Sequence, residues 1–137
     1  MVRRDGGRPH RSPAPVTTRE AVKLIDRALT DHGIYAVNLI DHPPMGFVRA
    51  ELATLRTVFP HVALLARIPV LSGQDGGNVV AVASRSPIPA AQIEARLGGR
   101  DLVWQVSRGA DLDRFVGDAP VLTDDFAPVD QLLTPYG

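Results

Sequence analysis

The sequence lacks several features that would place it in particular classes of protein. None of its 137 residues is cysteine, which excludes disulfides, thiolate nucleophiles and cysteine metal ligands. Fifteen basic residues balance fifteen acidic ones, so no net charge draws the chain toward nucleic acid or an anionic membrane. The longest plainly apolar run, Val62–Ala66, is far too short to cross a bilayer. We therefore expect a cytoplasmic protein with no nucleic-acid or membrane partner.

Composition divides the chain into a short tail and one folded unit. Residues 1–16 are rich in arginine, glycine and proline, which predicts a disordered basic tail. No aromatic residue is interleaved there for base stacking, and no apolar segment follows the arginines as in a secretory signal. Residues 17–137 have the balance of apolar and charged residues that is typical of a globular domain.

The first elements of the folded unit are a helix and a strand. Thr17 and Glu20 have the spacing of a capping box, and apolar residues with helical period follow until Gly33. The segment Ile34–Ile40 is apolar at most positions on both faces. This pattern predicts a buried strand in a parallel sheet.

The remaining pattern alternates helices and strands. An apolar stripe predicts a helix over Phe47–Phe59, ended by Pro60. Two further strands, separated by a glycine-rich turn, predict an antiparallel hairpin. These strands and the later elements are Val62–Ile68, Asn78–Ala83, a helix over Pro89–Leu97, a strand over Leu102–Val106 and a helical segment over Asp111–Val116. Such alternating units pack as helices against a sheet.

Several segments, in this order, resemble the C-terminal half of spermidine synthase-like proteins. They are Thr17–Glu20, Gly33–Asp41, Glu51–Val62, Gly76–Ser84 and the ending Leu122–Asp130, which reads Leu-Thr-Asp-Asp-Phe-Ala-Pro-Val-Asp. The resemblance implies the class I S-adenosylmethionine-dependent methyltransferase fold. The predicted fold class is thus α/β: a truncated Rossmann-like methyltransferase sheet of three or four strands, the last two an antiparallel hairpin, with flanking helices.

The resemblance also implies a reaction. Family members transfer an aminopropyl group from decarboxylated S-adenosylmethionine to a diamine, and others of the fold transfer methyl groups. The family's cofactor turn would need a G-x-G-x-x-G spacing, which is absent here. Only Asp5 could correspond to the family's catalytic aspartate, so the catalytic residues are unknown. We expect no cofactor to be bound by this chain alone, and weak or no transferase activity.

Four polar residues are candidates for binding an amine or polyamine substrate. Asn38 and Asp41 lie at the carboxyl end of the first strand, where ligands bind in open α/β sheets. Asp124 and Asp125 could pair with a cationic amine. The structural alternatives are that Asp41 caps the following loop, and that Asp124 and Asp125 form a turn. The histidines have no ligand spacing, so no metal site is expected.

The resemblance leaves the first strand without its family neighbour. A strand with an open edge invites pairing, so we expect a homodimer or a partner that supplies the missing half. The alternatives are a non-catalytic dimerising module, a gene remnant, or part of a methyltransferase. The sequence does not identify the amine substrate, and it does not distinguish aminopropyl transfer from methyl transfer.

Overall fold

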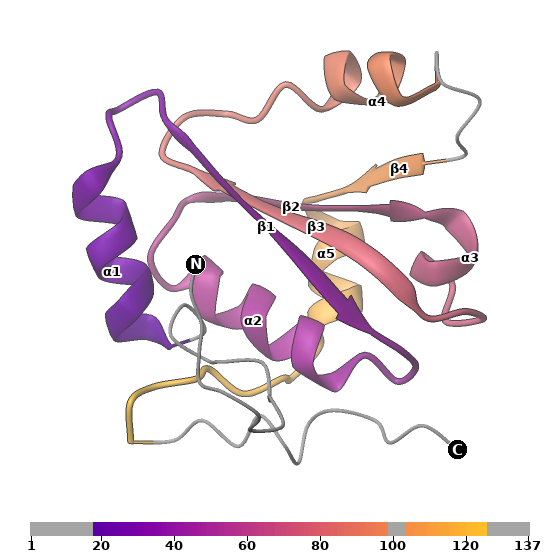
Figure 1. Cartoon of the computed structure of the whole chain (residues 1–137), viewed down its shortest axis with the longest axis horizontal. Coiled ribbons are helices and arrows are strands. Elements are labelled where there is room, and N and C mark those ends of the chain that lie inside the picture. Colours follow the sequence, from indigo (N-terminus) through magenta and orange to yellow (C-terminus); the bar gives the residue numbers. More distant parts are fainter. Residues whose placement is uncertain (1–17, 99–103, 126–137) are drawn as a thin grey trace, which may run out of the picture.

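A computed structural model describes residues 18–98 and 104–125 of the chain, which form a four-stranded sheet with helices on both faces (Figure 1). The helices are α1 (Arg19–Ala28), α2 (Gly46–Arg56), α3 (Ile68–Leu71), α4 (Ala90–Gly98) and α5 (Ala110–Val116). The strands are β1 (Ile34–Asp41), β2 (His61–Arg67), β3 (Gly77–Ser84) and β4 (Trp104–Ser107). The predicted tail, with Asp5, lies outside the described residues.

The strands are arranged in the order β1-β3-β2-β4, and each neighbouring pair is antiparallel. The predicted hairpin is confirmed, because β2 pairs with β3 from His61↔Ser84 to Leu65↔Val80. The parallel environment predicted for β1 is wrong within the described residues. Its one partner there is β3, which runs antiparallel to it between β1 and β2.

The inner face of the sheet packs against α1, α2 and α5. Side chains of this face alternate with those of the outer face along every strand. The resulting core joins the helices to the central strands, and its large buried members include Val22, Leu52, Leu55, Phe59, Leu64, Val79 and Leu112. This layer accounts for most of the buried apolar residues.

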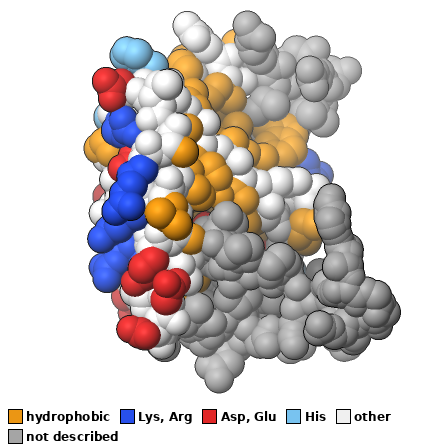
Figure 2. All heavy atoms as spheres, turned by 60° about the vertical axis from the view of Figure 1, so that its left-hand side comes forward, with side chains coloured by type: hydrophobic (Ala, Val, Ile, Leu, Met, Phe, Trp, Pro, Cys, Tyr) orange, Lys and Arg blue, Asp and Glu red, His pale blue; other side chains and the backbone are white. Residues whose placement is uncertain are grey.

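The outer face is covered unevenly. Helix α4 packs there over β2, β3 and β4, where Ala63, Leu65, Val82 and Val106 are buried. On β1 the same face is bare, with Ile34 49% and Ile40 63% exposed. Figure 2, which brings the α1 side of the molecule forward, shows hydrophobic side chains gathered beside a column of basic ones. The prediction that β1 is buried on both faces is therefore wrong.

Most element boundaries lie close to those predicted, with two informative differences. Thr18, not Thr17, is the N-cap of α1, and its hydroxyl accepts a hydrogen bond from the Ala21 amide at 3.3 Å. Strand β2 ends at Arg67, and one turn of helix, α3, follows. Pro69 suits the start of a helix and cannot donate to a strand ladder, which explains the early end of β2. No described helix has the length and apolar character needed to cross a membrane.

The segment after α5 returns to the first two helices. Leu122 is fully buried, and its amide donates to the Thr54 hydroxyl at 2.9 Å. Its carbonyl accepts from the Arg19 amide at 2.7 Å. The start of the Leu122–Asp130 motif is thus an anchor between α1 and α2.

Candidate functional site

Asp41 ends β1 and holds the start of α2. It is 2% exposed, and its carboxylate accepts three backbone hydrogen bonds. Oδ1 accepts from the His42 amide at 2.8 Å, and Oδ2 accepts from the amides of Phe47 at 3.1 Å and Val48 at 3.3 Å. The first amides of a helix need such acceptors, and a carboxylate there also interacts well with the helix dipole. The structural role predicted as the alternative for Asp41 is present.

The loop that Asp41 holds is tightly fitted against the β2–β3 turn. A Cβ at Gly76 would lie 2.4 Å from the His42 Cβ and 2.9 Å from the Asp41 carbonyl oxygen, so only glycine fits. Met45 is buried with a left-handed φ of 63°. A non-glycine residue rarely takes this conformation unless its surroundings hold it there. The loop at the carboxyl end of β1 is therefore held in one conformation by its close packing.

Asn38 does not join Asp41 in one polar wall. The two residues are three apart on β1, so their side chains lie on opposite faces of the sheet. Asn38 is exposed on the bare outer face, opposite Val80 of β3, while Asp41 points inward. The structure separates the pair that the sequence placed together.

Asp124 and Asp125 lie at the amino end of α1. The Asp124 amide donates to Glu20 Oε1 at 2.9 Å, and both aspartates are exposed. Backbone hydrogen bonds from Glu20 itself and from Asp124 lower the pKa of Glu20. Both aspartate side chains thus remain open to solvent. Amine binding by Asn38, Asp41, Asp124 and Asp125 stays a prediction.

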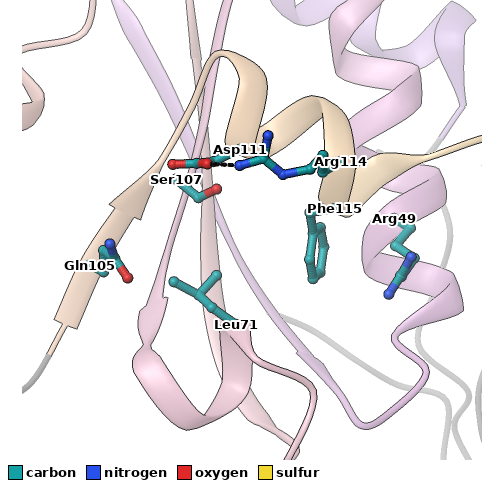
Figure 3. A pocket seen from close by; sticks show the side chains of 7 residues that line it. All are labelled: Arg49, Leu71, Gln105, Ser107, Asp111, Arg114 and Phe115. Atoms are coloured by element: carbon teal, nitrogen blue, oxygen red, sulfur yellow. Dashed lines mark hydrogen bonds and ion pairs between the residues drawn. The ribbon is translucent and has the colours of Figure 1, made fainter.

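A pocket that the sequence analysis missed lies between α2, α3, β4 and α5 (Figure 3). Its volume is about 470 Å³, and it is lined by Arg49, Leu71, Gln105, Ser107, Asp111, Arg114 and Phe115. Arg114 pairs with Asp111, and the Arg49 guanidinium carbon lies 4.8 Å from the centre of the Phe115 ring. These residues come from four separate elements, so no local spacing in the sequence could have indicated the pocket.

Glu51 is a second feature that the sequence analysis missed. Its carboxyl group is fully buried beneath the sheet, and neither oxygen has a hydrogen-bond partner. Burial raises the pKa of Glu51 to about 8, because a charged carboxylate is poorly solvated there. Burial and the nearby Glu51 also raise the pKa of Tyr35. The residues that the structure describes contain no group of three acidic or histidine side chains suited to a metal ion.

Comparison with known proteins gives one informative likeness. No protein-family model and no curated protein matches the chain. A solved structure does, described as that of a probable spermidine synthase from Corynebacterium glutamicum ATCC 13032. The TM-score is 0.75 at 27% sequence identity, and the match covers 96% of this chain and 48% of the other. The chain thus spans about half the length of that protein, and the predicted fold and spermidine synthase-like resemblance are confirmed.

Proposed function

We propose that this spermidine synthase-like chain forms the amine side of a transferase active site and depends on a second α/β half for its cofactor. The observation that carries the proposal is the extent of the match, which covers nearly all of this chain and about half of the solved relative. A cofactor turn is absent from these residues, since no G-x-G-x-x-G spacing occurs. Cofactor binding therefore falls to the other half.

The proposed amine side has two parts, the loop at the carboxyl end of β1 and the carboxylates near the amino end of α1. Asp41 positions the loop after β1 through three hydrogen bonds, and the exposed carboxylates of Asp124 and Asp125 remain available to a cationic amine. Transfer to an amine mainly requires positioning and a deprotonated nucleophile. The proposed reaction is aminopropyl transfer from decarboxylated S-adenosylmethionine to a diamine; the alternative is methyl transfer from S-adenosylmethionine.

Calorimetric titration tests whether cofactor binding requires the second half. We expect no binding of decarboxylated S-adenosylmethionine to the 137 residues alone. Fusion to the unmatched half of the Corynebacterium protein should restore binding and transfer to putrescine. Micromolar binding by the chain alone would contradict the proposal. Methylated product from S-adenosylmethionine, without aminopropyl product, would favour the alternative reaction.

The second half would dock on β1. Within the described residues β1 is an edge strand, and its outer face exposes Ile34 and Ile40. An exposed apolar edge strand is suited to strand addition. We propose that a strand of the second half pairs with β1 and that its helices cover these isoleucines.

Sedimentation of the chain, alone and mixed with the unmatched half of the relative, tests the docking proposal. A stable complex of the two halves is expected. A homodimer that excludes the added half would instead favour the dimerising module. A monodisperse monomer with a cooperative melt, unaffected by the added half, would contradict both.

A further inference from the structure

Two adjoining hollows share one arginine. The pocket of Figure 3 has a volume of about 470 Å³, and a neighbouring one of about 500 Å³ lies between the loops that follow β1 and β2. Arg49, Leu71 and Phe115 line both. We call this pair the Arg49 hollows. Strands β1 and β2 lie on either side of β3 and run in the same direction, so their carboxyl ends lie at the same edge of the sheet. The Arg49 hollows lie at this edge, which is where ligands bind in open α/β sheets.

Within the described residues Arg49 has no carboxylate partner, in contrast to Arg85 and Arg56. Arg85 pairs with Asp26 at 2.7 Å, and Arg56 pairs with Asp113 at 2.6 Å. The Arg49 guanidinium lies over the Phe115 ring, and within the described residues its buried Nε has no hydrogen-bond partner. A buried N–H without an acceptor is unfavourable, so the site would gain from a ligand that accepts it.

The surroundings of Arg49 favour an anion. The carboxylate that lines the two hollows, Asp111, is already paired with Arg114. Asp118 lines a third pocket beside Arg49, but the described residues form no ion pair between the two. Gln105 and Ser107, on the inner face of β4, add groups that can donate hydrogen bonds. The Arg49 guanidinium lies over the Phe115 ring, and its planar fork suits bidentate recognition of an oxyanion.

We propose that the Arg49 hollows bind a small oxyanion, a carboxylate or a phosphate, whose oxygens accept hydrogen bonds from the Arg49 guanidinium. Leu71 and the Phe115 ring provide an apolar wall for a short carbon chain attached to it. One of the hollows is lined by Pro43, Pro44 and Met45 of the loop that Asp41 holds, so the anion site adjoins the amine side proposed above. The two sites differ in the charge of their ligand, because an arginine repels a cationic amine. The anion site does not depend on the proposed transferase function.

Nuclear magnetic resonance of the whole chain tests the site directly. Inorganic phosphate and succinate are titrated separately at constant ionic strength while the arginine Nε–H signals are followed. Saturable shifts of the Arg49 signal and of the Leu71 and Phe115 amides are expected with at least one of them. The response to each anion distinguishes phosphate from carboxylate. Shifts that are absent, or that stay linear and include the exposed Arg27 equally, would overturn the proposal.

Two variants provide matched controls. Arg49→Lys keeps the charge but loses the planar fork, so affinity should fall about tenfold or more. Arg56→Gln removes a paired arginine from the same helix and should leave affinity unchanged. Equal losses in both variants would indicate general electrostatic attraction and overturn the site. The titration of the unmodified chain remains decisive if Arg49→Lys does not fold.

Discussion

On its inner face β1 presents Leu39 and Asp41, which are almost completely buried, whereas on its outer face Ile34 and Ile40 stay half exposed or more. Apolar residues on both faces are typical of strands covered on both sides. The described residues supply that cover on one side only. The two-sided apolar pattern of β1 thus lacks an outer cover in the described residues, and the chain spans about half of the solved relative. The proposed second half would supply that cover.

Polar groups follow the same division. The inner side holds Asp41, with three hydrogen bonds, and Glu51, with none. The outer face of β1 carries Asn38 in solvent. Burial makes both inner groups sensitive to substitution and makes Glu51 sensitive to pH, while the outer group is open to solvent. Four predictions test this contrast.

The largest effect is expected from pH acting on Glu51. Its folded pKa, about 8, lies above the ordinary value of 4.5, so the folded state binds the proton more tightly. Stability is then fully present below about pH 4.5 and is lost as pH rises through 8. The loss should reach up to about 5 kcal/mol, since one pKa unit corresponds to about 1.4 kcal/mol.

Urea unfolding between pH 5 and pH 9 measures this loss. Glu51→Gln removes the titration and should flatten the profile, whereas the exposed control Asp75→Asn should keep it. A steep decline that persists in Glu51→Gln would place the titrating group elsewhere.

The next effect compares neighbours on β1. Leu39→Ala should lower the free energy of unfolding by about 2–4 kcal/mol, because it leaves a cavity in the inner core. Ile40→Ala should change it by no more than about 0.5 kcal/mol, since the side chain is already largely in water. Denaturant titration of both variants checks the pair. Equal losses would mean that the outer face is covered in solution by a second molecule.

The sequence predicted this fold well where one local pattern determined one element. The helical stripes, the hairpin and the order of the elements other than α3 were predicted. The burial of β1 on both faces was predicted wrongly. An apolar strand has the same sequence pattern whether the residues that cover it belong to this chain or to another half. The sequence also brought Asn38 and Asp41 together by position, although alternation along a strand sets them on opposite faces. Arg49 and Glu51 gave no local signal, because their environments come from segments distant in the chain.

A third, smaller effect on stability compares Asp41 with Asn38. Asp41→Asn replaces an acceptor oxygen by a donor facing backbone amides, so a loss of about 1–3 kcal/mol is expected. Asn38→Ala, on the solvent side of the same strand, should change stability by less than about 0.5 kcal/mol. Thermal unfolding of the two variants and the unmodified chain measures both changes in stability. A larger loss for Asn38→Ala would mean that its side chain has a partner in solution.

The smallest effect on stability is expected for the two aspartates near α1. Asp124 contributes its backbone amide to Glu20, and this bond survives a change of side chain. Asp124→Ala and Asp125→Ala should therefore alter the free energy of unfolding by less than about 0.5 kcal/mol. In the fused two-half enzyme, loss of a carboxylate that pairs with the amine should raise KM for putrescine several-fold with little change in kcat. Unchanged KM in both variants would show that these carboxylates are surface groups and would limit the amine site to the loop that Asp41 holds.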